Sequence, residues 1–246
     1  MSSMQQQRAA NHSAPEQLAT NTRASTHTQP AVGNQEFQRR MRSNQNAATA
    51  RNIPADMFEN TGLREEVFSK ALHAFEQAFT EGRAQSAVVT IIDYELHSSE
   101  KRFWVIDLES QALLHHTYTT HGQGSDRNHD GEMDSVSNRP GSNQSNVGLM
   151  QTDETYTGRH GTSLKLDGLE AGFNDNAKDR HIVIHSATYA DDKYVRRHGK
   201  TGRSHGCPAL DPDVAGEIID TIKGGKLVFA YYPDPQWLER SQYLEH

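Results

Sequence analysis

The stretch from His181 to Leu210 reads HIVIHSATYADDKYVRRHGKTGRSHGCPAL, and it decides the fold and the chemistry that the sequence predicts. Its first residues are largely β-branched and predict a short strand with His185 and Ser186 at its end. Near its other end stands Cys207, the only cysteine of the chain, between a glycine and a proline. A strand-end histidine and a cysteine in a tight turn are the first candidates for a reactive pair.

The lone cysteine limits what the chain can be. It forms no intramolecular disulfide, and it excludes a disulfide-stapled secreted scaffold and a zinc site built from several cysteines. A cysteine attacks as the thiolate, so a catalytic one needs a nearby base and donors for the oxyanion that forms. The alternative is a small buried cysteine that only packs. The polar, glycine-rich and basic neighbours of Cys207 favour the nucleophile.

The sequence predicts two amphipathic helices, one far upstream of this stretch and one directly after it. From Leu63 to Thr80, apolar side chains recur at spacings of three and four and predict a helix with one buried stripe, which ends near Gly82. After the cysteine, the residues from Pro212 to Lys223 predict a second helix, with Asp211 as its N-cap.

Short runs of β-branched and aromatic residues, bounded by turn residues, predict five strands. They are Ala87–Asp93, Phe103–Leu108, Leu113–Thr119, His181–His185 and Leu227–Tyr232. Between Thr120 and Arg180 regular periodicity fades, and glycine, asparagine and serine dominate. We therefore expect a loop-rich region there. A loop region of this length inside a domain is usually functional.

Residues 1–56 differ from the rest in composition. They hold few large apolar side chains, so they cannot bury enough surface to offset the entropy of ordering. We expect a disordered polar tail, either a solvated spacer or a weakly basic tether to an anionic surface, since its six arginines outnumber its three acidic residues. Residues 57–243 form the predicted catalytic domain. Residues 244–246 look like the start of a purification tag and are set aside from the fold prediction.

The overall composition excludes further classes. The chain has 246 residues and a formal net charge of -7, so it lacks the positive field that nonspecific nucleic-acid binding uses. No apolar run approaches the roughly 18 residues of a membrane-spanning helix. No hydrophobic signal-peptide core opens the chain, so we expect either a cytoplasmic protein or a chain that begins after a removed export signal.

The run Ser204-His205-Gly206-Cys207, with a strand ending in His185-Ser186 before it, resembles the signature of the murein L,D-transpeptidase catalytic domain family, the YkuD-type cysteine transpeptidases. The likeness extends over roughly Leu63 to Tyr232. Upstream it includes His121-Gly122, Ser137-Asn138, Gly141-Ser142, Thr152–Leu169, Asn174–Ala177 and Arg180. The resemblance implies an α+β fold with a β-sandwich-like mixed sheet core, an N-terminal helix and a helix after the nucleophile.

The resemblance also implies roles. Cys207 is the expected nucleophile and His185 its general base, with the backbone carbonyl of Ser186 orienting the imidazole. The amides of Gly206 and Cys207 are the expected oxyanion donors. His205 competes for the role of base, but close neighbours in sequence seldom meet face to face, which favours His185.

Four residues near the cysteine are candidates for substrate binding: Arg203, Ser204, His205 and Tyr189. Arg203 is the nearest fixed positive charge and suits a substrate carboxylate, with a surface salt bridge as the alternative. Tyr189 suits an apolar wall of the donor site, with a place in the core as the alternative.

The implied function is acyl transfer on peptidoglycan. The cysteine forms a thioester with a tetrapeptide stem and releases D-alanine, and an amine of a neighbouring stem then takes the acyl group to give a 3→3 crosslink. The alternatives are an L,D-carboxypeptidase, in which water takes the acyl group, and a non-catalytic peptidoglycan-binding module. We expect no required cofactor, peptidoglycan stem peptides as partners, acylation by carbapenems, and a place in the periplasm or cell envelope. The oligomeric state stays open.

A second motif, DRNHDGEMD, spans residues 126–134. Oxygen-bearing side chains occupy positions 1, 3, 5 and 9 of a calcium-binding loop, and they are Asp126, Asn128, Asp130 and Asp134. Position 12 is Ser137 rather than glutamate, so the alternative is an acidic solvated loop. The motif predicts a structural Ca²⁺ that orders the loop. The 14 histidines form no H-E-x-x-H pattern, which argues against catalytic zinc.

Overall fold

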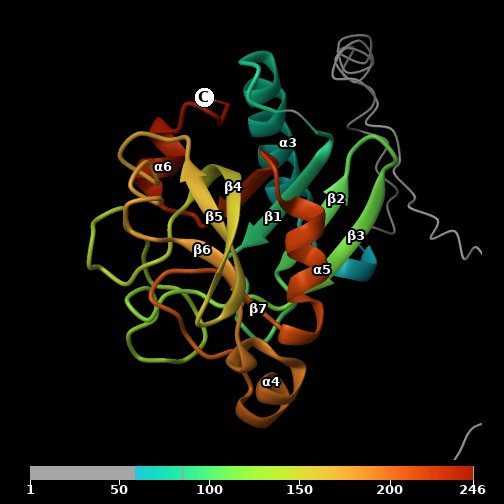
Figure 1. The fold of residues 1–246 in the computed structure, drawn as a ribbon. Coiled ribbons are helices and arrows are strands. Elements are labelled where there is room, and N and C mark those ends of the chain that lie inside the picture. Colours follow the sequence, from blue (N-terminus) through green and yellow to red (C-terminus); the bar gives the residue numbers. More distant parts are fainter. Residues whose placement is uncertain (1–58, 85, 246) are drawn as a thin grey trace, which may run out of the picture. The chain divides into compact units, whose positions relative to one another are not determined.

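The computed structural model describes residues 59–84 and 86–245 (Figure 1). They belong to the second of the two units into which the chain divides, Val32–His246. The predicted tail, residues 1–56, lies outside the described residues. None of the helices in the described part is both long enough and apolar enough to cross a membrane.

The first long helix, α3, spans Glu65–Thr80 and confirms the predicted apolar stripe. Its buried residues are Val67, Phe68, Ala71, Ala74, Phe75 and Ala78. The helix begins at Glu65 rather than at Leu63, because Arg64 is extended and its guanidinium binds both oxygens of the buried Asp93, at 2.8 and 2.9 Å. Gly82 follows the helix with a φ of 76°, a left-handed conformation that glycine adopts easily.

Eight strands form one mixed sheet in the order β3-β2-β1-β8-β4-β5-β6-β7. Their bounds are Val88–Asp93 (β1), Phe103–Asp107 (β2), Ala112–Thr117 (β3), Gly148–Gly158 (β4), Gly161–Gly168 (β5), Val183–Ser186 (β6), Ala209–Leu210 (β7) and Leu227–Tyr231 (β8). The pairs β1–β8 and β6–β7 are parallel, and the other pairs are antiparallel. All five predicted strands are present, with ends shifted by one or two residues.

Helices cover both faces of the sheet. Neighbouring strand residues point to opposite faces, so Ile91 packs in a cluster with α3 and with Trp237 of α6 (Pro235–Arg240), whereas Ile92 packs in a cluster with α5 (Pro212–Ile222). The second cluster joins residues of β1 and β2 to residues of β5 and β6, so the two ends of the sheet curve around a shared core. The predicted α+β class with a mixed sheet core is thereby confirmed.

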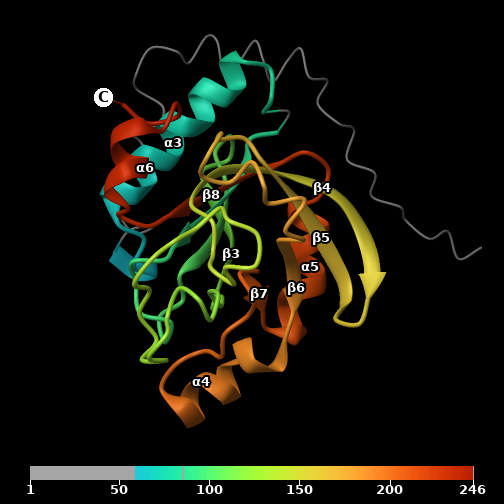
Figure 2. The same ribbon diagram turned by 90° about the vertical axis from the view of Figure 1, so that its left-hand side faces the viewer.

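The loop-rich region expected between Thr120 and Arg180 contains a long hairpin, and that part of the prediction was wrong. Strands β4 and β5 pair antiparallel from Met150–Gly168 to Gly158–Gly161. The outer half of β4 is polar and exposed, and a register shift between Thr152 and Thr155 breaks its alternation. A strand that buries only its first half lacks the periodic signal on which the prediction relied. Figure 2 shows the outer end of the hairpin standing out from the rest of the sheet.

The predicted helix after the cysteine is α5, and the Asp211 carboxylate caps it by accepting a hydrogen bond from the Asp213 amide. Two short helices were not predicted: α4 (Asp192–His198) and α6. In both figures α4 lies at the end of the molecule opposite α3 and α6. Leu244, which the fold prediction set aside, is buried against the cluster that holds α3.

Candidate active site

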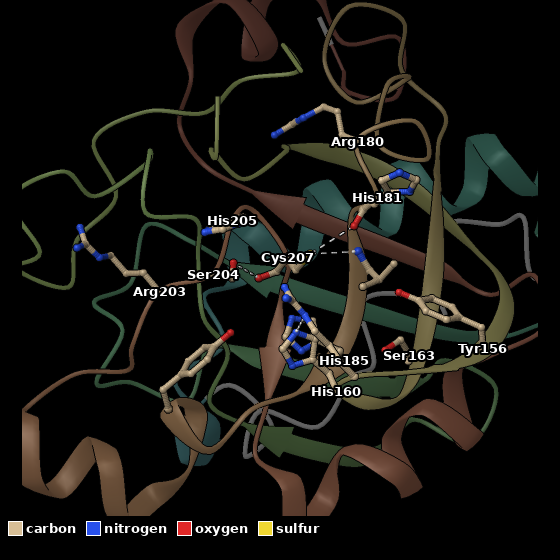
Figure 3. A pocket seen from close by; sticks show the side chains of 14 residues that line it. Tyr156, His160, Ser163, Arg180, His181, His185, Arg203, Ser204, His205 and Cys207 are labelled. Atoms are coloured by element: carbon tan, nitrogen blue, oxygen red, sulfur yellow. Dashed lines mark hydrogen bonds between the residues drawn. The ribbon is translucent and has the colours of Figure 1, made fainter. Parts of the chain in front are cut away.

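The parallel pairing of β6 with β7 brings the two predicted reactive side chains together. His185 pairs with Ala209, and Cys207 lies just before Ala209 in the chain. The two side chains therefore reach the same edge of the sheet from neighbouring strands. Both line one cavity of about 600 Å³, which Figure 3 shows from close by.

Ser204 shapes the turn that carries the cysteine. Its hydroxyl donates to the carbonyl oxygen of Cys207 at 2.6 Å and accepts from the Gly206 amide at 3.0 Å. The Ser204 amide donates to the carbonyl of His121 at 2.9 Å, beside the parallel bridge between Gly122 and Ser204. The hydroxyl is thus used within the turn, although Ser204 also lines the cavity.

Gly206 is the one residue of this turn that no other amino acid replaces easily. Its φ is 120°, outside the range that side chains tolerate. A Cβ there would lie 2.7 Å from the carbonyl oxygen of Gln144 and 2.9 Å from the side chain of Ile182. The close approach of Gln144 and Ile182 to Gly206 fixes the position of the turn at the cavity.

The Cys207 thiol is half-buried and faces backbone groups. Its Sγ accepts from the Val183 amide at 3.5 Å and lies 3.6 Å from the carbonyl oxygen of His181. Burial raises the pKa of the thiol, while the Val183 amide and the charge of Arg180 lower it. The net shift is upward, so the resting group at neutral pH is the thiol.

His185 is buried, with 4% of its surface exposed. Its Nδ1 lies 2.9 Å from the carbonyl oxygen of Ser186, which is the contact that the family resemblance implied. A carbonyl only accepts, so Nδ1 carries the proton and Nε2 is left with a free lone pair. Burial lowers the pKa of His185, the Ser186 carbonyl raises it, and the charges of His160 and Arg159 lower it further. The imidazole is therefore neutral at neutral pH.

A neutral thiol and a neutral imidazole thus share the cavity. Among the hydrogen bonds of the described residues, none joins Cys207 Sγ to the His185 ring. This arrangement suits general-base removal of the thiol proton at the moment of attack, rather than a resting thiolate–imidazolium pair.

The two amides expected to hold an oxyanion differ in their contacts. The Gly206 amide already donates to Ser204 Oγ, so in this conformation it is not free for an oxyanion. The Cys207 amide makes no hydrogen bond among those of the described residues. A single backbone donor beside the sulfur is therefore what this geometry offers.

The remaining predicted residues line the same cavity at different places. Arg203 points away from Cys207 (Figure 3), and its Nη1 donates to the carbonyl oxygen of Asp126. Tyr189 lies in the short helical turn Thr188–Ala190 and packs against Gly202, where a Cβ would come within 2.7 Å of its side chain. His205 is exposed. Their roles in substrate binding stay predictions.

Two further cavity residues received no role from the sequence. His160 lies at the tip of the β4–β5 hairpin, and its ring centroid is 4.6 Å from that of His185 (Figure 3). The His160 carbonyl also accepts from Ser186 Oγ at 2.9 Å. His160 stands in a sequence run that resembles the family. Its place over the end of β6 could not be predicted, because the sequence did not predict the β4–β5 hairpin that carries it.

Arg180 is the second of these residues. Its guanidinium donates to four neutral acceptors: Ser137 O (2.6 Å), Gln144 O (2.6 Å), Asn146 Oδ1 (2.8 Å) and Ser142 Oγ (3.2 Å). Among the ion pairs of the described residues, none involves Arg180. Its positive charge therefore acts on the cavity without a carboxylate to offset it, and it lowers the pKa of the Cys207 thiol.

A buried polar network lies behind the turn. His121 receives a hydrogen bond at Nδ1 from Arg102 Nη2 at 2.7 Å and donates from Nε2 to Asp126 Oδ2 at 3.0 Å. Burial and the Arg102 charge lower the pKa of His121 to about 3, against the raising effect of Asp126. The neutral His121 thus connects the turn, through its own carbonyl, to the 126–134 loop.

The predicted calcium loop is closed by its own hydrogen bonds. Asp126 accepts from the amides of Asp130 and Gly131, both at 3.1 Å, as well as from His121. Asp130 accepts from the Asn128 side-chain amide at 2.7 Å. Nowhere in residues 59–84 and 86–245 do three or more His, Cys, Asp or Glu side chains gather to hold a metal. In this conformation Asp126 and Asp130 are engaged within the loop and by His121, and the Ca²⁺ ion stays a prediction that calorimetric titration checks.

A family model described as the L,D-transpeptidase catalytic domain matches residues 59–231. The chain belongs to this family. The match includes β1 to β8, the cavity and every residue of the turn around Cys207. A comparison of the chain with curated protein sequences found no match.

Solved structures of L,D-transpeptidases also resemble the chain, at low identity. The L,D-transpeptidase of Mycobacterium smegmatis is 15% identical, over 60% of this chain and 59% of that one, with a TM-score of 0.36. L,D-transpeptidase 1 of Mycobacterium tuberculosis is 14% identical, over 59% and 62%, with a TM-score of 0.33. The helical cell shape determining protein Pgp2 of Campylobacter jejuni is 12% identical, over 59% and 47%, with a TM-score of 0.39. The chain thus spans less than two thirds of each of these proteins.

Proposed function

We propose that the chain is a peptidoglycan L,D-transpeptidase that uses Cys207 as its nucleophile and His185 as its general base. The observation that carries the proposal is the shared cavity, in which the only thiol of the chain stands with an imidazole whose Nε2 has a free lone pair. Membership of the L,D-transpeptidase family supplies the substrate class.

In the first half-reaction the thiol proton passes to His185 Nε2 as Sγ bonds to the carbonyl carbon between the third stem residue and D-alanine. The Cys207 amide donates to the oxyanion that forms. The carbon–nitrogen bond then breaks, the imidazolium gives its proton to the leaving nitrogen, and D-alanine departs. A thioester on Cys207 remains.

In the second half-reaction an amine of a neighbouring stem attacks the thioester. His185 takes a proton from this amine, and the sulfur leaves and is protonated again. The product is a 3→3 crosslink. The Ser186 carbonyl holds the imidazole through both steps, because it favours the imidazolium that forms in each.

The substrate sets the place of action and the partners. We propose that the protein works in the periplasm or cell envelope on peptidoglycan stem peptides. Carbapenems carry a reactive carbonyl, and they acylate Cys207 in the proposed enzyme, which adds the mass of the drug to the intact protein.

Incubation with disaccharide-tetrapeptide tests the function. The expected products are free D-alanine and a crosslinked dimer, and Cys207→Ala and His185→Ala each lower D-alanine release at least 10³-fold. Half-buried His73→Ala on α3, away from the cavity, serves as the matched control and keeps full turnover. Free tripeptide without dimer identifies the L,D-carboxypeptidase instead. Unchanged turnover in Cys207→Ala contradicts the proposed chemistry.

A further inference from the structure

The cavity carries positive charge without any acidic residue of its own. Of the 14 residues that line it, three are arginines and four are histidines, and none is Asp or Glu. The whole chain has the opposite balance, with 32 acidic against 25 basic side chains. Such a local reversal focuses a positive field into one cleft and favours an anionic ligand there.

The three arginines differ in what already holds them. Arg180 donates to four neutral acceptors, and Arg203 donates to the carbonyl of Asp126. Arg159 makes a single hydrogen bond, from its Nε to His160 Nε2 at 3.0 Å. Among the contacts of the described residues, its two terminal NH₂ groups have no carboxylate or carbonyl partner. Arg159 is therefore the guanidinium with donors left for a ligand.

Arg159 is also held beside the reacting groups. Its hydrogen bond to His160, at the tip of the β4–β5 hairpin, ties it to a ring that packs at a tilt against His185. The charge of Arg159 lowers the pKa of His185 and so weakens the base in the free enzyme. A carboxylate bound to Arg159 offsets that charge and restores the basicity of His185 when substrate is present.

We propose that Arg159 binds a free carboxylate of the donor stem peptide, so that the enzyme selects donors that carry this carboxylate over donors in which it is a carboxamide. The inference rests on the proposed function and names the substrate form that the site takes. A planar guanidinium pairs with a carboxylate through two parallel hydrogen bonds, whereas a carboxamide offers one acceptor and no charge.

The test compares three tetrapeptide donors with the wild-type enzyme: one with all carboxylates free, one amidated at the side chain of the third residue, and one amidated at the terminal D-alanine. The readout is kcat/KM for release of the fourth residue. We expect one of the two amidated donors to react at least tenfold more slowly than the free acid, since a charge-assisted hydrogen bond is lost.

The variants locate the effect. Arg159→Gln lowers kcat/KM on the free acid about tenfold and abolishes the preference for it, whereas Arg159→Lys keeps part of the preference. The control variant Arg240→Gln, at an exposed position of α6, keeps the full preference. Equal rates of the wild type on all three donors overturn the inference and leave the proposed function standing. An Arg159→Gln variant that slows all three donors alike also overturns it. No release from any donor overturns the function itself.

Discussion

At the scale of single residues, the contact between the tilted rings of His160 and His185 affects how basic the candidate site is. Electrostatic repulsion from His160 lowers the pKa of His185, and the proposed attack needs a neutral His185. His160→Phe keeps the ring contact and removes the charge. We expect the pKa of His185 to rise, so the acid limb of the kcat/KM profile moves to higher pH. His73→Phe on α3 leaves the limb in place, and a limb that moves to lower pH in His160→Phe contradicts the interpretation.

Arg180 acts on the thiol through its charge as well as through its hydrogen bonds, and two substitutions separate these effects. Arg180→Lys keeps the charge and loses most of the four hydrogen bonds, whereas Arg180→Gln loses both. We expect the pKa of Cys207 to rise in Arg180→Gln and to stay near the wild-type value in Arg180→Lys. The pH dependence of iodoacetamide alkylation measures it directly, because the chain has one cysteine. Equal shifts in both variants indicate a purely structural role.

That Cys207 and His185 lie in one cavity was predictable because a contiguous motif and a strand end mark them, whereas the contact with the Ser186 carbonyl was implied only by the family resemblance. The bond from the Gly206 amide to Ser204 Oγ was not predictable, since it depends on the rotamer of a serine hydroxyl. His160 and Arg180 gained roles only once the hairpin and the 137–146 loop had positions in space.

At the scale of elements, Glu170 fixes the C-terminal helix to the sheet. This buried carboxylate accepts from the Leu149 amide at 2.5 Å, from Trp237 Nε1 at 2.9 Å and from Ser241 Oγ at 2.6 Å. Glu170→Ala removes the carboxylate that accepts from these three buried donors. We expect a loss of about 3–5 kcal/mol in the free energy of unfolding, measured by urea denaturation. Glu239→Ala, at an exposed position of α6, changes it by less than about 0.5 kcal/mol. A loss of less than about 0.5 kcal/mol in Glu170→Ala contradicts the role of Glu170 in fixing α6 to the sheet.

The helices α3 and α5 were predictable because each keeps a continuous apolar stripe and has a recognisable end. Strand β4 was not, because only its first half is buried and its register shifts midway. Strand β7 has two residues, too few for any periodicity, yet it pairs the strand of the proposed base with the segment of the proposed nucleophile.

At the scale of the whole molecule, buried neutral histidines predict sensitivity to acid. The pKa of His121 is lowered from 6.5 to about 3, so between these pH values the unfolded chain binds a proton that the folded chain does not. Stability is therefore lost as the pH falls below about 6.5. Burial lowers the pKa of His185 and His116 as well, with the same sign.

Urea denaturation at a series of pH values between 7 and 4 measures this effect. We expect the free energy of unfolding to fall steadily over that range, and to fall less steeply in His121→Asn, which keeps a hydrogen-bonding side chain but does not titrate. A wild-type curve that is flat from pH 7 to pH 5 contradicts the prediction.

The pairing of His185 with Ala209 has a consequence for how such a site diversifies. The reacting atoms are fixed by the register of two strands, and the chain between them, including α4, only has to leave one strand and return to the other. Tyr189 and Arg203, on either side of α4, line the cavity, so we expect insertions or deletions at α4 to change that part of the wall while the strand register holds sulfur and imidazole in place. We therefore expect the long interval between the histidine and the cysteine to tolerate changes that alter substrate selectivity while the two candidate reactive groups stay in register.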